Sequence, residues 1–324
     1  MSDSDFPFEE GRSPDASPDA SPEANPDPPQ PAPEPPGYLW RPVTPPAPAL
    51  HVVPPAPRPR LIPNLGHVAV FVLLLFPALI GGYLVALFTI YAMHPHVRLT
   101  ALMPQIGHNV MYAVSMQAAI YAVLWALAAL IFSLWWNRSF SSGIHWNLSV
   151  AIRRLPVLAA LGLVTGLAIT LAGNFLPMPK APPILEDLTK SAAGAWTLMA
   201  FGVTLAPLTE ELAFRGFLLP SLINSFRWLE RKGAISKPTV SFVGIPLSIV
   251  LTSIPFALMH AQQVSDSWGP VLLIGCVSII LCIVRLASDS VAAGVVVHAC
   301  YNLTLFSGLL YQTDWFRHLD KLKT

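Results

Sequence analysis

Three charged side chains lie within an otherwise apolar stretch of this 324-residue chain. Residues 204–220 have the sequence TLAPLTEELAFRGFLLP, in which the charges are Glu210, Glu211 and Arg215. Ionisable groups at membrane depth cost about 2.5 to 3.5 kcal/mol each on insertion scales, so chains that keep them usually face them toward a polar cavity. This stretch is therefore the first candidate for a functional site.

The two glutamates are expected to have different partners. On a helix, Glu211 and Arg215 are four residues apart, so they share one face and can neutralise each other. Glu210 is rotated by about 100° from Glu211 and has no partner within this segment. A carboxylate without a cation in an apolar site is a candidate general acid or base. The alternative is a structural ion-pair cluster that holds helices together.

Two further polar pairs lie inside later apolar stretches. In the sequence FALMH, Phe256 and His260 are four residues apart, and in HACYN, His298 and Asn302 have the same spacing. Each pair therefore occupies one face of its helix. A single histidine in an apolar helix is more often a core residue than a ligand. Polar elements on three helices, however, favour one shared site.

This set of side chains is sufficient to hydrolyse a peptide bond. Glu210 can polarise a water molecule with help from His260, while His298 and Asn302 can donate hydrogen bonds to the developing oxyanion. In a second interpretation, Glu210, His260 and His298 bind zinc or another divalent metal whose water is the nucleophile. The residues do not choose between the two, and the HExxH motif of zinc proteases is absent. The cofactor is thus a divalent metal or none.

The composition indicates which elements position these residues. Only 11% of the residues are charged and 53% are hydrophobic, which is typical of polytopic membrane proteins. The apolar segments near or above the roughly 20 residues of a spanning helix are Gly66–Met93, Asn109–Trp136, Leu155–Pro177, Ala193–Leu222, Val243–Ala261, Gly269–Ala287 and Val291–Tyr311. An all-α integral membrane protein with about seven to eight transmembrane helices and an intramembrane cavity is expected. No basic tract or motif points to nucleic acid.

Residues 1–60 differ in composition from the rest of the chain. They hold half of the 18 acidic residues and many prolines, so they cannot bury a core and are predicted to be a disordered, proline-rich acidic tail. Arg58 and Arg60 precede the first apolar segment, and further cations lie between the second and third and between the fourth and fifth. The positive-inside rule places the amino terminus in the cytoplasm. Without an organelle signal, a bacterial inner membrane is the expected location.

The three motifs together resemble a known family. Their order and helical placement, over about 193–310, are similar to those of the CPBP family of CAAX proteases and bacteriocin-processing proteins, also called the Abi family. This family includes the type II CAAX prenyl endopeptidases. The motif residues are Glu210-Glu211-x-x-x-Arg215, Phe256-x-x-x-His260 and His298-x-x-x-Asn302.

The resemblance implies an intramembrane protease with a role for each motif residue. Glu210 would be the general base and His260 its partner in activating water, while His298 and Asn302 would stabilise the oxyanion. The residues implied to support the site are Glu211, Arg215 and Phe256. The family is labelled metalloprotease, yet a metal-free glutamate mechanism has been argued for it. The substrate would be a membrane-associated protein or peptide, of CAAX or bacteriocin type.

The resemblance also suggests a division of the chain beyond the tail. Residues 61–192 would be accessory transmembrane helices, 193–311 the catalytic core, and 312–324 a short polar C-terminal tail. Two other functions stay open: a non-catalytic membrane scaffold or bacteriocin-immunity protein, and a proton-coupled transporter. An unpaired Glu210 argues against the scaffold, and the lack of an obvious internal repeat argues against the transporter.

Overall fold

The computed structural model describes residues 60–94, 96, 98, 100–101, 109–179 and 190–322. The chain divides into two units, Met1–Pro57 and Arg58–Thr324, and all described residues belong to the second. The predicted proline-rich tail, residues 1–60, lies outside the described residues except for Arg60.

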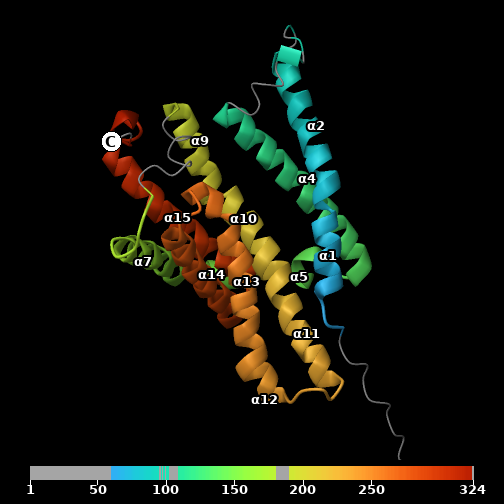
Figure 1. Ribbon diagram of the computed structural model, residues 1–324. Helices are drawn as coiled ribbons and strands as arrows, with labels where there is room; N and C mark the ends of the chain where they lie inside the picture. Colours follow the sequence, from blue (N-terminus) through green and yellow to red (C-terminus); the bar gives the residue numbers. More distant parts are fainter. Residues whose placement is uncertain are drawn as a thin grey trace, which may run out of the picture. The chain divides into compact units, whose positions relative to one another are not determined.

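The described residues form helices and no strand, as Figure 1 shows. The helices are α1 (Leu65–Leu73), α2 (Leu75–Met93), α4 (Val110–Trp136), α5 (Phe140–Gly143), α6 (Leu148–Arg153), α7 (Leu155–Gly173), α9 (Ala192–Val203), α10 (Leu205–Glu211), the π-helix η1 (Leu212–Leu218), α11 (Leu219–Arg231), α12 (Lys237–Thr239), the π-helix η2 (Val240–Gly244), α13 (Ile245–Met259), the 3-10 helix η3 (Ala261–Val264), α14 (Trp268–Ser288), α15 (Val291–Gln312) and the 3-10 helix η4 (Leu319–Leu322). The predicted all-α class is confirmed.

Seven helical segments of the described chain are long and apolar enough to cross a membrane, so this is an integral membrane protein. They are Leu65–Met93, Val110–Trp136, Leu155–Gly173, Ala192–Arg231, Lys237–Met259, Trp268–Ser288 and Val291–Gln312. An eighth such helix is not found among the described residues. The fourth segment ends at Arg231, whereas the sequence predicted Leu222, because α11 continues as an amphipathic helix with polar residues that an apolar-run criterion leaves out.

The fourth segment is not one continuous α-helix. It is interrupted at Thr204, whose ψ of −78° separates α9 from α10. Pro207 explains the break, because a proline ring clashes with the carbonyl four residues earlier, and that carbonyl belongs to Val203, the last residue of α9. After Glu211 the chain continues as the π-helix η1. Such wide turns often mark functional sites.

Helix α15 is packed closely against α7. At Gly162 and Gly166 of α7, an added Cβ would collide with Val297 and Thr304 of α15, respectively. Two small residues four apart allow the backbones of membrane helices to approach in this way. The close approach fixes the helix that carries His298.

The N-terminal helices contact the π-helix η1 through a cluster of aromatic side chains. Phe71 of α1 stacks on Phe217 of η1, with ring centroids 4.8 Å apart. Phe132 and Trp136 of α4 also pack against Phe217, at 4.9 and 5.8 Å. Helices α1 and α4 therefore support the segment that follows the two glutamates.

Candidate functional site

Glu210, His260 and His298 converge from three segments of the chain. Glu210 lies near the end of α10, His260 immediately follows α13, and His298 lies within α15. The Nε2 atoms of both histidines are 3.7 Å from Glu210 Oε2. The exposed fractions of the three side chains are 13% for Glu210, 16% for His260 and 4% for His298. The structure thus brings together three of the four predicted catalytic residues.

Both imidazoles turn the same nitrogen toward Glu210. His260 Nδ1 donates to the Phe256 carbonyl over 2.8 Å, and His298 Nδ1 donates to Glu211 Oε1 over 3.1 Å. Since carbonyl and carboxylate oxygens only accept hydrogen bonds, Nδ1 carries the proton in each ring. Nε2 of each imidazole therefore faces the Glu210 carboxylate.

Glu211 and Arg215 form the predicted ion pair, although Arg215 lies in a π-helix. Arg215 Nη1 is 3.0 Å from Glu211 Oε1, and both side chains are fully buried. Arg215 Nη2 also donates to the carbonyl and the hydroxyl of Ser278 in α14, over 2.9 and 2.7 Å. The guanidinium lies 4.5 Å from the centre of the Phe256 ring. These contacts join η1, α13 and α14 behind the two histidines.

The sequence analysis missed three residues of α14 and α15 that also contact Glu211 or Arg215. Ser278 binds Arg215 as described above, and Arg285 Nε donates to the Arg215 carbonyl over 3.3 Å. A Cβ added at Gly294 would lie 2.7 Å from Glu211 Oε2. The sequence could have indicated Gly294, because this residue lies one helical turn before His298 and on the same helix face. The serine carried no sequence signal.

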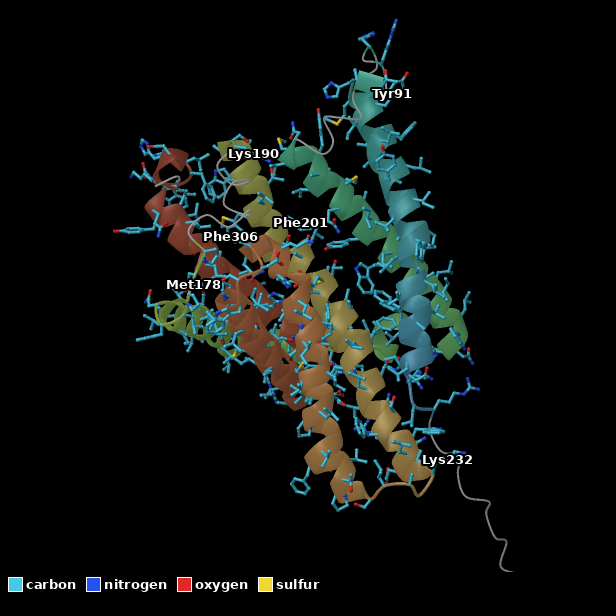
Figure 2. All side chains as sticks on the ribbon, viewed as in Figure 1. Tyr91, Met178, Lys190, Phe201, Lys232 and Phe306 are labelled. Carbon is cyan, nitrogen blue, oxygen red and sulfur yellow. The ribbon has the colours of Figure 1, made fainter. Side chains whose placement is uncertain are left out.

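Asn302 has a partner outside this group. Its Nδ2 donates to the Gly202 carbonyl over 2.7 Å, which ties α15 to the last turn of α9. Gly202 is also where Phe306 of α15 packs against α9, a side chain labelled in Figure 2. One N–H of the Asn302 amide is therefore used in helix packing, and a second hydrogen bond of this amide is not found among the described residues.

Helix α4 packs against the segment that leads to Glu210, a contact that the sequence analysis did not predict. Trp125 Nε1 donates to Thr209 Oγ1 over 3.3 Å, one residue before Glu210. Tyr121 stacks on Phe201 of α9 with ring centroids 5.9 Å apart, and Phe201 is labelled in Figure 2. Aromatic residues are common in apolar helices, so their types gave no indication of this contact.

The carboxylate of Glu210 is incompletely satisfied. Its Oε2 is buried and has no hydrogen-bond partner among the described residues, and the same holds for Glu211 Oε2. The 3.7 Å separations from the two imidazoles exceed hydrogen-bond length. A buried acceptor without a partner is costly in a fold, and a bound water molecule is one way to satisfy it.

A metal-binding role for Glu210, His260 and His298 was the second interpretation of the sequence. Across the described ranges, no group of three or more His, Cys, Asp and Glu side chains is arranged to hold a metal ion. Glu210, His260 and His298 are included in that search. Whether these three residues bind a metal therefore stays a prediction.

A family model matches the part of the chain that carries the site. Residues 192–304 match the family described as type II CAAX prenyl endopeptidase Rce1-like. The matched range begins with α9, ends within α15 and contains every residue of the three motifs. The curated proteins and the solved structures yield no match. The family prediction made from the motifs is confirmed.

Proposed function

Because residues 192–304 are a type II CAAX prenyl endopeptidase Rce1-like domain, we propose that this protein is a glutamate-dependent intramembrane endopeptidase. Its substrate would be a membrane-associated protein or peptide of CAAX type, cleaved at a peptide bond within the bilayer. Glu210 would be the general base, supported by His260 and His298.

One observation carries the proposal. Glu210 Oε2 is buried without a hydrogen-bond partner among the described residues, and two imidazole Nε2 atoms face it at 3.7 Å. A water molecule bound to Glu210 in this space would meet both imidazoles. The geometry suits a general base that must hold and deprotonate water, since such contacts often shorten only when substrate is bound.

The reaction would begin with proton transfer. His260 accepts one hydrogen bond from the water through Nε2 and orients it, while Glu210 Oε2 takes a proton from it. The resulting hydroxide adds to the carbonyl carbon of the scissile bond, which forms a tetrahedral oxyanion. When the carbon–nitrogen bond breaks, protonated Glu210 returns its proton to the leaving amine.

His298 would stabilise the oxyanion as an imidazolium. Glu211 holds Nδ1 of this ring, and the Nε2–H of the imidazolium would donate to the oxyanion. Asn302 would assist with the N–H that does not bind Gly202. Arg215 and Phe256 would hold Glu211 and His260 in position without touching the substrate.

The steps proposed above use only side chains of this protein and a water molecule. We also propose that the amino terminus is cytoplasmic and that the membrane is a bacterial inner membrane, on the arginine distribution of the loops. The site would then be reached from within the bilayer.

The experiment is cleavage of a membrane-peptide library by the purified full-length protein in detergent, with and without phenanthroline. The library contains prenylated CAAX peptides, their unprenylated counterparts and bacteriocin-like peptides. Cleavage of CAAX peptides that persists with the chelator supports the proposal. Complete loss with the chelator contradicts the metal-free mechanism, and cleavage of bacteriocin-like peptides alone contradicts the substrate class. If the folded protein cleaves none of them, the result favours the scaffold or immunity alternative over the protease.

A further inference from the structure

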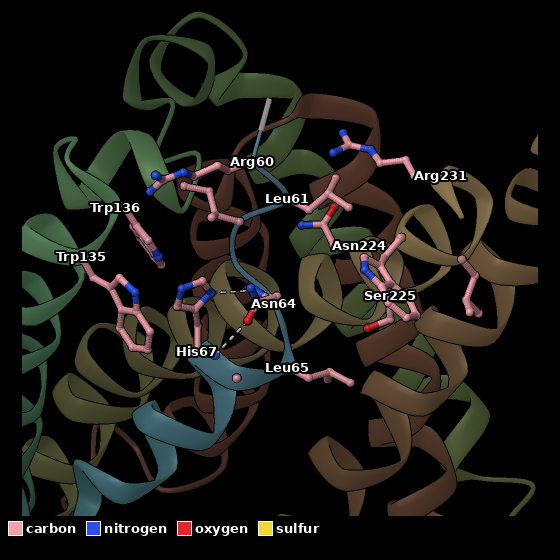
Figure 3. Close-up of a pocket in the computed structure, with 14 residues that line it drawn as sticks. Arg60, Leu61, Asn64, Leu65, His67, Trp135, Trp136, Asn224, Ser225 and Arg231 are labelled. Atoms are coloured by element: carbon pink, nitrogen blue, oxygen red, sulfur yellow. Dashed lines mark hydrogen bonds between the residues drawn. The ribbon is translucent and has the colours of Figure 1, made fainter. Parts of the chain in front are cut away.

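A second site lies apart from Glu210, where three membrane-crossing segments end. It is a cavity of about 820 Å³ between the start of α1, the end of α4 and the outer turns of α11 (Figure 3). The spanning segments Leu65–Met93, Val110–Trp136 and Ala192–Arg231 begin or end at this cavity. It therefore lies at the level of the membrane surface. None of the motif residues lines it.

The charged residues in the described lining of the cavity are both arginines. Arg60 and Arg231 line it, and its described lining includes no aspartate or glutamate. Arg60 is exposed and directly precedes α1. A cavity with this sign and size favours a small anionic group such as a phosphate.

Two buried donors point to the same ligand. Trp136 is only 5% exposed, and its Nε1–H has no hydrogen-bond partner among the described residues. His67 Nδ1 accepts a hydrogen bond from the backbone N–H of Asn64 over 3.0 Å, so the ring proton of neutral His67 lies on Nε2. Figure 3 shows the indole nitrogen of Trp136 turned toward the His67 ring. The two rings are nearly perpendicular with centroids 5.6 Å apart, so one acceptor beside both rings can take both hydrogen bonds.

The rest of the lining suits the apolar part of a lipid. Trp135, Trp228 and Leu65 line the cavity and are about half exposed, at 51%, 54% and 48%. Tryptophan is enriched where helices leave the hydrocarbon core, because its ring is apolar and its N–H is polar. Basic pockets between helices at this level bind anionic headgroups.

We propose that this cavity binds the phosphate headgroup of an anionic phospholipid. Arg60, Trp136 Nε1–H and His67 Nε2–H would donate to the phosphate oxygens, while Trp135 and Trp228 contact the glycerol and the first acyl carbons. Because helices α1, α4 and α11 all line the cavity, the bound lipid would also hold them together. The assignment is independent of the protease activity.

The test is native mass spectrometry of the full-length protein in detergent. Equimolar short-chain phosphatidylglycerol and phosphatidylcholine with identical acyl chains compete for the protein. The wild type is expected to retain phosphatidylglycerol in preference, and Arg60→Gln to weaken this retention about tenfold, the order expected when one charge-assisted hydrogen bond is lost. Arg60→Lys should keep part of the preference because it keeps the charge.

Arg153→Gln is the matched control, because Arg153 is an exposed arginine that does not line the cavity. It should retain phosphatidylglycerol like the wild type. Equal retention of the two lipids by the wild type, or an equal loss in Arg60→Gln and Arg153→Gln, would overturn the proposal. Displacement of the lipid by millimolar inorganic phosphate would overturn it too, since the site would then bind free phosphate rather than a lipid.

Discussion

His298 and Glu211 are joined by a hydrogen bond of 3.1 Å from Nδ1 to Oε1, which leaves His298 Nε2 facing Glu210. A single imidazole thus links two glutamates that are adjacent in sequence but differ in surroundings. Glu211 is fully buried and paired with Arg215, whereas Glu210 is slightly exposed and lacks a cation of its own. The two carboxylates therefore differ: Glu211 is held by Arg215 and His298, whereas Glu210 Oε2 has no hydrogen-bond partner among the described residues.

Arg215→Ala should destabilise the protein strongly. The substitution leaves the buried Glu211 carboxylate without its cation, and breaking a buried pair costs about 3 to 5 kcal/mol of unfolding free energy. Thermal unfolding in detergent measures the loss. Arg153→Ala, which removes an exposed arginine, should leave the midpoint almost unchanged. Equal midpoints for the two variants would show that the buried pair does not support the fold.

Gly294→Ala should lower proteolysis and stability together. The new Cβ would lie 2.7 Å from Glu211 Oε2, and Glu211 is already fixed by Arg215 and His298. Gly308→Ala in the same helix is the control, because nothing lies within 4 Å of its Cβ and alanine is the better helix former. Activity and unfolding midpoints of both variants are compared. Wild-type activity in Gly294→Ala would show that Glu211 can move without consequence.

The spacing of the motif residues was sufficient to predict part of this site. The four-residue separation of Glu211 and Arg215 predicted their ion pair. The pair is present at 3.0 Å even though Arg215 lies in a π-helix rather than an α-helix. Hydropathy predicted the spanning helices because each is an apolar run long enough to cross a membrane. The outer turns of α11 were missed because their apolar residues occupy only one face.

Other features depend on contacts between distant segments, which one sequence does not specify. Ser278 meets Arg215 across 63 residues, and Asn302 meets Gly202 across 100. Serine and glycine have no special meaning in an apolar helix until their neighbours are known. The partner of Asn302 was therefore not predictable, although its place on the His298 face was.

His260→Ala should reduce turnover by about a hundredfold or more without a large effect on stability. The expected loss is that of an acid–base group. His260 follows the end of α13 and is 16% exposed, so its removal leaves no large buried cavity. Initial rates of peptide cleavage measure the effect. The control is His318→Ala, which removes an exposed histidine remote in sequence from the motifs. Equal cleavage rates for the two variants would show that His260 takes no part in the reaction.

Acid should weaken the loop contact at Asp289, which lies between α14 and α15. Burial acts to raise the pKa of Asp289, but hydrogen bonds and charge from His145 and Arg285 outweigh it and hold the pKa below the usual value. A lowered pKa contributes stability that is present above the unfolded value of about 3.9 and is lost as the pH falls through the folded value.

The measurement is the unfolding midpoint of the wild type and Asp289→Asn at several pH values. Asparagine suits this position, where φ is 48°, so the variant removes the charge without backbone strain. The wild type should be the more stable at pH 7, and the difference should shrink below about pH 4. A difference that is independent of pH would contradict a role for the carboxylate charge.

Glu210→Gln tests the central claim most directly. The amide keeps the shape of the side chain but cannot accept a proton from water, so cleavage of the best library peptide should fall by at least about a hundredfold with an unchanged unfolding midpoint. Glu230→Gln in α11 removes a glutamate outside the site and should cleave at the wild-type rate. Cleavage by Glu210→Gln at the rate of Glu230→Gln would contradict the assignment of Glu210 as the general base.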